Sequence, residues 1–258
     1  MNRRVIVTRP AHEASRWVDA LNGAGLRAVA LPLIAIEPLE DAGALAAARL
    51  AVVRQDALMF VSAAAASHFV DARVAADLAA DPAPRCWATG PGTVRALQEA
   101  GVPASCIDAP GDDAAQFDSE ALWAVVRPQV VAGTRVLIVR GGDVAGQPGG
   151  RDWLARTVQS AGGAVEVVAA YRRLAPIFGE AERRLAIQGA TDGSVWLFSS
   201  SEGIANLCQA VPEIDWRSAR AVATHPRIGE AARAAGFGTV ALSQPGLAAL
   251  AASIESFQ

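Results

Sequence analysis

The chain has 258 residues, of which 52% are hydrophobic and 19% are charged, and its formal net charge is −3. This length is large for one domain and suits two domains of middle size, each able to bury a core. The charge balance is not that of a nucleic-acid-binding surface, and the hydrophobic content excludes a disordered chain. We therefore expect a globular protein with a small-molecule partner and no nucleic-acid partner.

The basic residues are all of one kind: the 23 basic positions are arginines, and the sequence contains no lysine. This excludes a Schiff-base lysine, a pyridoxal-phosphate anchor and a P-loop lysine. Arginine keeps its charge and can hold a carboxylate or phosphate through two parallel hydrogen bonds. Binding of an anion therefore remains open.

The cysteines argue against metal binding and disulfide bonds. Cys86, Cys106 and Cys208 are odd in number and widely spaced, and we interpret them as buried core thiols. The N-terminal sequence MNRRVIVTRP lacks the apolar run of a secretion signal, and no run is long enough for a transmembrane helix. The sequence predicts a cytoplasmic protein with no metal and no membrane partner.

The first half of the chain alternates apolar runs with helical patterns. We expect strands at 4–8, 57–61, 85–89 and 104–108, a long extended stretch at 26–38, and helices at 11–24, 42–54, 63–79, up to 101, and at 114–126. The strands are apolar throughout rather than alternating. That pattern predicts parallel sheets covered by helices on both faces, an α/β fold.

The pattern restarts at Arg135, where RVLIVRG resembles the opening RVIVTRP. The segment LMFVS at 58–62 then matches WLFSS at 196–200, and RCWATGP at 85–91 matches RAVATHP at 220–226, in the same order and at nearly the same spacing. The chain is therefore an internal duplication of a strand–helix unit.

Two long extended stretches, 25–38 and 163–176, each begin at a glycine and end at a proline. Both exceed the usual strand length of about 5–6 residues. If each carries the chain between domains, residues 1–34 plus 174–258 form one domain, residues 38–169 form the other, and 35–37 and 170–173 connect them. The alternative is two consecutive domains divided near residue 130.

In open parallel sheets, ligands bind beyond the carboxyl ends of the strands, where helix N-termini present free backbone N–H groups. Each residue type at such positions has an alternative to ligand binding. The serines and the threonine could cap helices, the arginines could form ion pairs, and the histidine could be an ordinary loop residue. The glycine-rich loop 141–150 could wrap an anion, but no nucleotide fingerprint is present. The candidate binding residues are Arg9, Ser62, Thr93, Arg140, Arg151, Ser199, Ser200, Ser201, His225 and Arg227.

These segments, taken in order, resemble the uroporphyrinogen-III synthase family along the whole chain. The resemblance is carried by VIVTRP near the start, ALPLIAIEP at the first long stretch, ATGPGTVRALQEAG at 88–101, VLIVRG, Tyr171-Arg172, LFSSSEG at 197–203 and HPRIGEAARAAGFG at 225–238. It implies two flavodoxin-like parallel-sheet domains joined by a two-stranded connector.

The resemblance also implies a monomeric lyase of heme biosynthesis that needs no cofactor. Family members close the linear tetrapyrrole hydroxymethylbilane into uroporphyrinogen III, with inversion of ring D and loss of water. By position, Tyr171, the only tyrosine, matches the tyrosine that assists departure of the hydroxyl, and we take it as the catalytic candidate. Ser62, Thr93 and Ser201 match hydroxyl-bearing cleft positions of the family.

Two departures from the family pattern limit what can be carried over. The usual Thr-Ser before the first-half helix is Val61-Ser62, and the Gly-Pro-Thr-Thr of some members is HPRI at 225–228. In the first repeat, Leu33 holds the position of Tyr171. The alternative functions are a two-lobed protein that binds an anionic small molecule without chemistry, and a nucleotide-dependent enzyme, which the missing glycine fingerprint disfavours.

Overall fold

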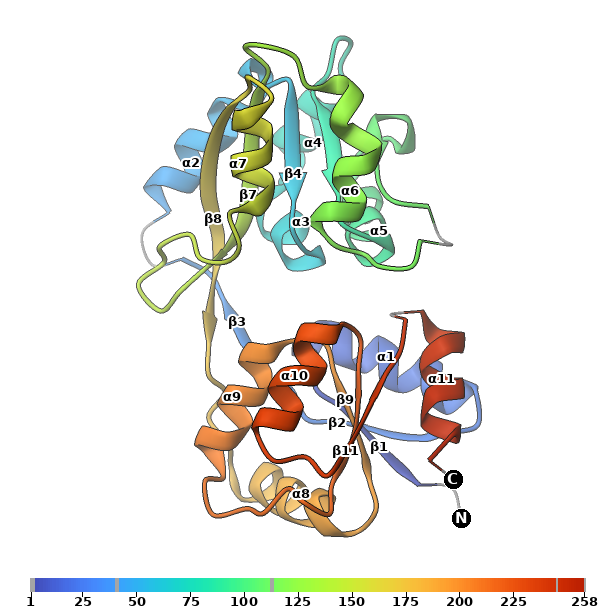
Figure 1. Ribbon diagram of the computed structural model, residues 1–258. Coiled ribbons are helices and arrows are strands. Elements are labelled where there is room, and N and C mark those ends of the chain that lie inside the picture. Colours follow the sequence, from blue (N-terminus) through green and yellow to red (C-terminus); the bar gives the residue numbers. More distant parts are fainter. Residues whose placement is uncertain (1–2, 40–41, 112–113, 245, 258) are drawn as a thin grey trace. The chain divides into compact units, whose positions relative to one another are not determined.

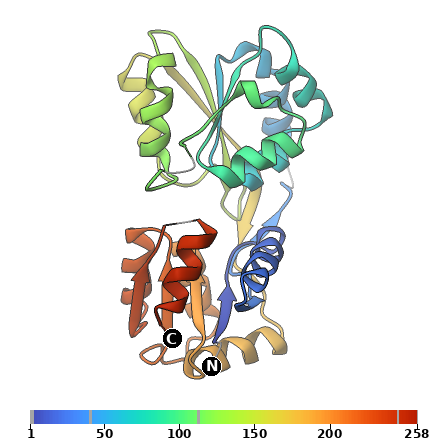
Figure 2. The ribbon, with the colours of Figure 1, turned by 90° about the vertical axis from the view of Figure 1, so that its right-hand side faces the viewer.

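The structure, a computed structural model, describes residues 3–39, 42–111, 114–244 and 246–257. They fold into two compact units (Figure 1). The first unit holds the chain up to Ala35 and again from Leu174, and the second unit holds Ile36–Arg173. A second view shows helices on both sides of the sheet in each unit (Figure 2).

The first unit is built on a five-stranded sheet in the order β11-β10-β9-β1-β2. Every strand pair in it is parallel. Its strands are β1 (Arg4–Val7), β2 (Arg27–Ala30), β9 (Val195–Phe198), β10 (Arg220–Ala223) and β11 (Thr239–Leu242). Its helices are α1 (Ala11–Gly23), α8 (Glu180–Thr191), α9 (Ser201–Ala210), α10 (Pro226–Ala234) and α11 (Leu247–Glu255).

The two faces of this sheet are both buried. Trp196 and Phe198 of β9 pack with α8, α9 and α10 on one face, whereas Val195 and Leu197 pack with α1 and α11 on the other. Successive side chains of a strand point to opposite faces, so a strand covered on both sides must be apolar at every position. The sequence VWLF meets this requirement.

The second unit is built on a six-stranded sheet in the order β3-β8-β7-β4-β5-β6. Its strands are β3 (Ala35–Glu37), β4 (Ala57–Phe60), β5 (Arg85–Ala88), β6 (Ile107–Asp108), β7 (Arg135–Gly142) and β8 (Ala164–Leu174). Its helices are α2 (Gly43–Leu50), α3 (Ala63–Phe69), α4 (Ala72–Ala79), α5 (Pro91–Glu99), α6 (Ser119–Val126) and α7 (Trp153–Ser160), with short 3₁₀ helices at Val52–Arg54, Ala104–Cys106 and Arg127–Gln129.

Helices cover both faces of this sheet as well. Leu58 and Phe60 of β4 pack with α2 to α5, and Ala57 and Met59 pack with α6 and α7. The pairs of β7 with β4 and β8, and of β5 with β4 and β6, are all parallel. The predicted α/β class with two predominantly parallel sheets is confirmed. The boundaries between the units fall in β3 and β8, which are neighbours in this sheet.

Several local predictions were wrong. The helix expected at 63–79 is two helices, because the Asp71 carboxylate accepts a hydrogen bond from the Val74 N–H and starts a new helix. The helix expected from 114 begins only after Asp118, whose side chain caps it in the same way. The extended stretch 26–38, which was expected to exceed one strand, comprises β2 and β3 with an irregular segment between them.

The cysteine interpretation holds for one thiol of three. Cys86 lies inside β5 and is buried, whereas Cys106 and Cys208 are partly exposed, since they lie at the end of a 3₁₀ turn and near the end of α9. Burial raises the pKa of the Cys86 thiol to about 12. At neutral pH Cys86 is therefore a protonated core residue.

Asp192 joins β1 to the start of β9. Its carboxylate accepts hydrogen bonds from the Ser194 N–H at 2.9 Å and the Ser194 hydroxyl at 2.6 Å, and it pairs with Arg4. Partial burial alone would raise the Asp192 pKa, but these hydrogen bonds and the Arg4 charge outweigh it and lower the pKa below its ordinary value. The carboxylate therefore stabilises the fold when it is charged.

We expect Asp192→Ala to lower the free energy of unfolding by about 1 kcal/mol at neutral pH, a modest value because the side chain is 35% exposed. A lowered native pKa contributes stability above the unfolded pKa of about 3.9, and that contribution is lost as the pH falls through the native value. The difference between variant and wild type in urea unfolding should thus shrink below about pH 4. A difference that stays constant down to pH 3 would contradict this account.

Candidate functional site

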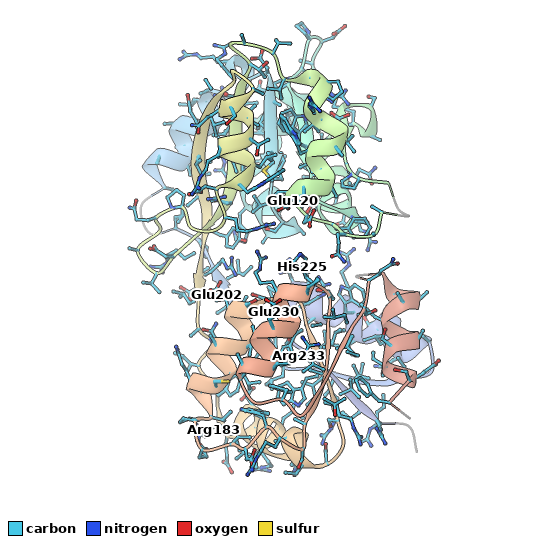
Figure 3. All side chains as sticks on the ribbon, in the orientation of Figure 1. Glu120, Arg183, Glu202, His225, Glu230 and Arg233 are labelled. Carbon is cyan, nitrogen blue, oxygen red and sulfur yellow. The ribbon has the colours of Figure 1, made fainter. Side chains whose placement is uncertain are left out.

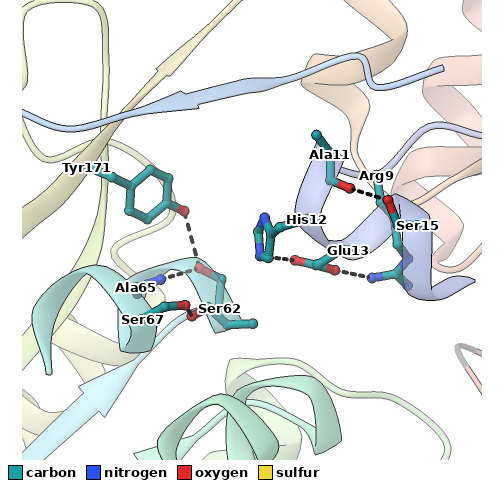
Figure 4. A network of polar contacts seen from close by, with 10 residues as sticks. Arg9, Ala11, His12, Glu13, Ser15, Ser62, Ala65, Ser67 and Tyr171 are labelled. Atoms are coloured by element: carbon teal, nitrogen blue, oxygen red, sulfur yellow. Dashed lines mark hydrogen bonds and ion pairs between the residues drawn. The ribbon is translucent and has the colours of Figure 1, made fainter. Parts of the chain in front are cut away.

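The second unit places Tyr171 beside the carboxyl ends of two neighbouring strands. Tyr171 of β8 is paired with Gly141 near the end of β7, and Ser62 is the second residue after β4, the next strand. The Tyr171 hydroxyl oxygen lies 3.2 Å from the Ser62 Oγ (Figure 4). The tyrosine side chain thus reaches from β8 across β7 to the loop after β4.

Ser62 also caps α3. Its Oγ accepts a hydrogen bond of 3.1 Å from the Ala65 N–H. The capping alternative is therefore observed. It does not use all the hydrogen-bonding sites of Ser62, because a hydroxyl has one donor and two acceptor sites. One acceptor site serves the helix, and the remaining capacity is directed at Tyr171.

Two contacts of Tyr171 were missed in the sequence. The His68 ring, on α3, lies with its centroid 5.5 Å from the Tyr171 ring, and a Cβ atom at Gly141 would lie 2.8 Å from two carbons of that ring. Tyr171 itself is 4% exposed. The alignment of the two repeats places His68 at the position of Asn206, and a polar residue at this position in both repeats could have drawn attention to His68.

Arg140 is held within its own unit. Its side chain is 8% exposed, its Nη1 donates to Asp152 Oδ1 at 3.1 Å and its Nη2 donates to the Arg151 carbonyl oxygen at 2.6 Å. The Nε of Arg140 is buried without a hydrogen-bond partner among the described residues. Arg151 makes two hydrogen bonds to Glu120, of 2.7 and 3.1 Å.

The glycine-rich loop is held by hydrogen bonds within the loop itself. Asp143 Oδ1 accepts hydrogen bonds from the N–H groups of Ala145 and Gln147, both at 2.9 Å, and Gly142 bridges to Pro148. The first two residues of the predicted loop 141–150 belong to β7. With Arg140 bound to the carbonyl of Arg151, the loop is closed at both ends.

We expect Arg140→Ala to destabilise the protein by about 1–3 kcal/mol, because it removes a buried guanidinium and leaves the Arg151 carbonyl without its donor. Loop 143–150 should also be cut faster in limited proteolysis. Arg151→Ala is the matched control, since it breaks an exposed pair worth at most about 1 kcal/mol. Equal losses in urea unfolding for the two variants would refute the anchoring role of Arg140.

In the first unit, Arg9 follows β1 and stays close to α1. Its Nη1 donates to Glu13 Oε2 at 2.9 Å (Figure 4), and its guanidinium lies 4.6 Å from the centroid of the Trp17 ring. Its Nε is buried and, among the described residues, has no hydrogen-bond partner. The ion-pair alternative is therefore observed for Arg9, as it is for Arg140 and Arg151.

The serines of the first unit differ in role. Ser200 caps α9 by accepting from the Gly203 N–H at 3.4 Å, and Ser199 precedes it, half-buried, at the end of β9. The Ser201 Oγ is buried and makes no hydrogen bond within the described part of the chain. Of the three serines, Ser201 is the one whose hydroxyl oxygen is buried without a partner among the described residues.

His225 and Arg227 lie at the start of α10. The His225 Nδ1 accepts a hydrogen bond of 3.1 Å from the Arg227 N–H and so caps the helix. Figure 3 shows His225 at the N-terminal end of α10 and Glu202 at that of α9. Arg227 is exposed. Thr93, in the second unit, is 4% exposed in the first turn of α5.

The structure therefore joins Ser62 to Tyr171 directly and places Arg140 beside Arg151, while Arg9, the serines 199–201 and the pair His225 and Arg227 belong to the first unit. Within the described ranges, no group of three or more His, Cys, Asp or Glu residues could hold a metal ion. In the same ranges no helix has the length and apolar character needed to span a membrane. The groups that the candidate residues supply for binding or catalysis are hydroxyls, guanidinium groups and the N–H groups of helix N-termini.

Comparison with known proteins gives one consistent family. Residues 15–252 match the family described as "Uroporphyrinogen-III synthase HemD". A relative described as uroporphyrinogen-III synthase of Salmonella typhimurium (strain LT2) is 31% identical over 211 residues, which cover 81% of this chain and 80% of the relative.

Solved structures agree in fold. Uroporphyrinogen-III synthetase from Helicobacter pylori 26695 superposes with a TM-score of 0.58, covering 99% of this chain and 100% of that one. A mutant uroporphyrinogen III synthase from the extremely thermophilic bacterium Thermus thermophilus gives 0.56, with coverage of 99% and 98%. Both are 14% identical to this chain, so they support the fold alone.

Proposed function

The chain belongs to the uroporphyrinogen-III synthase family, and we propose that it closes hydroxymethylbilane into uroporphyrinogen III with inversion of ring D and loss of water. The observation that carries this proposal is the family match over residues 15–252, together with a relative that is 31% identical. The reaction makes the protein a cyclising lyase of porphyrin biosynthesis. A binding protein without chemistry is not favoured by these matches.

The chemical task is selection as much as acceleration. Departure of the terminal hydroxyl leaves a reactive azafulvene, which closes unaided to the unrearranged isomer. The enzyme must hold the chain so that ring D is attacked at its substituted carbon, through a spiro intermediate. Positioning of two reacting ends lowers such a barrier by removing their translational and rotational freedom, and dipoles set in advance stabilise the charged intermediate.

Tyr171 is the residue we propose to assist departure of the hydroxyl. A phenol O–H can donate a proton to the leaving oxygen, so that it departs as water. Two observations support the choice: Tyr171 is the only tyrosine in the sequence, and its hydroxyl is held by Ser62 at the carboxyl end of β4. Ring packing by itself does not require that polar contact.

The substrate carries several carboxylates, and we propose that these are bound by guanidinium groups, hydroxyls and helix-start N–H groups. Arg9 and Arg140 each have a buried Nε with no partner among the described residues, and the Ser201 hydroxyl is in the same state, which supports a ligand role for them. The proposed binding residues are Arg9, Ser62, Thr93, Arg140, Arg151, Ser199, Ser200, Ser201, His225 and Arg227.

We further propose that the enzyme acts as a monomer, in the cytoplasm, without a cofactor. Each unit has its own buried core on both faces of its sheet, which supports folding without a partner subunit. The three cysteines are free thiols, as is usual for proteins of a reducing compartment. Absence of a cofactor follows the family resemblance.

The proposal predicts that incubation with hydroxymethylbilane gives uroporphyrinogen III, measured by separating the product isomers. Without protein, the unrearranged isomer should form. Formation of that isomer alone in the presence of the protein would refute the function. Tight binding of the tetrapyrrole without conversion would instead support the binding-protein alternative.

For Tyr171→Phe we expect turnover to fall by about 10²-fold or more, because the proton donor is lost while the ring is kept. The free energy of unfolding should fall by only about 1 kcal/mol, the value of one hydrogen bond. Thr8→Val is the control: it removes a buried hydroxyl bonded to the Leu197 carbonyl at 2.7 Å, and Val139 stands at the equivalent place in the second repeat. Equal turnover of the two variants would leave Tyr171 a packing residue.

A further inference from the structure

We propose that Ser62, His68 and Gly141 position the Tyr171 hydroxyl, and that Ser62 donates its own hydrogen to the Tyr171 oxygen. The phenolic hydrogen then stays available to the substrate. This inference rests on the proposed function, since it concerns the residue that we assign to departure of the hydroxyl. It gives Ser62 a positioning role through the tyrosine in place of direct substrate binding. It also brings in His68 and Gly141, which lie outside the proposed binding set.

The first observation is a break in the alternation of β8. Arg140 pairs with Ala169, but the next residue, Gly141, pairs with Tyr171, so Ala170 is an extra residue on β8. In a regular strand, successive side chains point to opposite faces. Ala170 and Tyr171 instead belong to the same core cluster, with α3. A bulge of this kind re-aims a side chain, and here it turns Tyr171 toward the face that carries Ser62.

The second observation is the missing side chain at position 141. A Cβ atom there would lie 2.8 Å from Cε2 and Cζ of Tyr171 and 2.8 Å from Cδ of Arg173. Such distances are far below van der Waals contact between carbon atoms. The Tyr171 ring therefore lies directly on the backbone of β7, and only glycine at position 141 allows the hydroxyl to reach the loop after β4.

The third observation concerns the other side of the ring. His68 is half-buried near the end of α3, and its ring is tilted by 37° against that of Tyr171. The end of α3 is fixed, because Arg49 donates to the carbonyl oxygens of His68 and Phe69 at 2.6 and 2.9 Å. The histidine thus restricts rotation of the tyrosine away from Ser62.

The duplication provides an internal comparison. When the repeats are aligned, the residues equivalent to Ser62, His68 and Tyr171 are Ser200, Asn206 and Leu33, and Pro10 is the counterpart of Gly141. Ser200 still caps its helix, while the Asn206 amide donates to the Leu33 carbonyl oxygen at 2.8 Å. Capping by serine is therefore common to both repeats. The tyrosine, the glycine beneath it and the imidazole beside it occur together in only one.

The capping role of Ser62 favours Ser62 as the donor of the hydrogen bond to Tyr171. Ser62 Oγ accepts from the Ala65 N–H, and a hydroxyl that accepts a hydrogen bond becomes a better donor. Donation to Tyr171 stabilises negative charge on its oxygen while the phenolic proton passes to the departing hydroxyl, which leaves as water. In the spiro intermediate the substituted carbon of ring D is bonded both to the terminal carbon and to its original methylene bridge. The bond to that bridge then breaks, and the methylene bonds to the unsubstituted α-carbon of ring D. This α-carbon loses one proton, which restores the phenol. The net products are the macrocycle and one water molecule.

A double-mutant cycle tests the proposal. We expect Ser62→Ala to lower kcat about tenfold and His68→Asn, which installs the residue of the other repeat, to lower it several-fold, with KM little changed. In a Tyr171→Phe background, neither change should lower kcat further, because the group that they position is gone. Ser62→Thr keeps both the cap and the donor and should restore most of the wild-type turnover.

Three results would overturn the proposal: equal loss of kcat in the two backgrounds, a rise in KM alone, or the same loss of kcat in Asp118→Ala. Asp118 caps α6 in the same unit through a side-chain oxygen 2.9 Å from the Ala121 N–H. Because α6 packs on the sheet face opposite to Tyr171, this variant measures the cost of a lost cap away from the tyrosine. If the wild type produces uroporphyrinogen III but the effects of the substitutions on kcat are additive, only the positioning role is rejected. If the wild type produces no uroporphyrinogen III, the proposed function itself is rejected.

Gly141→Ala gives a test that does not depend on activity. Because Tyr171 is the only tyrosine, isotope labelling of tyrosine gives one ring signature in the NMR spectrum. We expect that signature to shift in Gly141→Ala and in His68→Asn. It should not move in Gly23→Ala, where an added Cβ atom meets nothing within 4 Å. An unmoved signature in both test variants would refute the packing on which the proposal depends.

Discussion

The hydrogen bond between Tyr171 and Ser62 depends on three parallel strands that end at the same edge of one sheet. In an antiparallel arrangement, β8, β7 and β4 would not all present their carboxyl ends to one loop cluster. Parallel strands must in turn be covered on both faces, which explains the apolar sequence of β4 and β9. The contact that we assign to chemistry is therefore a consequence of the layered core.

The duplication shows how one scaffold carries unequal sites. Both repeats keep a serine cap after the strand that precedes α3 or α9, because every helix start has N–H groups to satisfy. The tyrosine needs more than the scaffold: it requires a bulge that re-aims it and a glycine that leaves room for its ring. The repeat with Leu33 supports the same fold without either device. Stability and site chemistry are thus separable in this chain.

Much of the fold could be predicted from the sequence, because continuous apolar strands and a repeated order of motifs are strong signals. The elements that were missed, such as the helix starts at Asp71 and Asp118, depend on single side-chain hydrogen bonds that compete with the helical pattern. The role of Gly141 was not predictable, since it arises from contact with the ring of Tyr171 on the neighbouring strand, which the sequence alone does not align with it. The candidate arginines could be named from the sequence as possible ion-pair members. Their acidic partners, Glu13, Asp152 and Glu120, could not, because side-chain pairing depends on how the loops fold.

Those partners bear on how an anionic substrate can be bound by a chain without lysine. Arg151 and Glu120 form an exposed pair, worth at most about 1 kcal/mol, so exchange of Glu120 for a substrate carboxylate costs little. Arg140 differs, because its side chain is 8% exposed and bonded to a backbone carbonyl, and removing those contacts leaves buried groups unsatisfied. On the proposed function, Arg151 is the arginine suited to exchange partners. Arg140 is suited to hold the loop in place and to offer a ligand only its unpaired Nε.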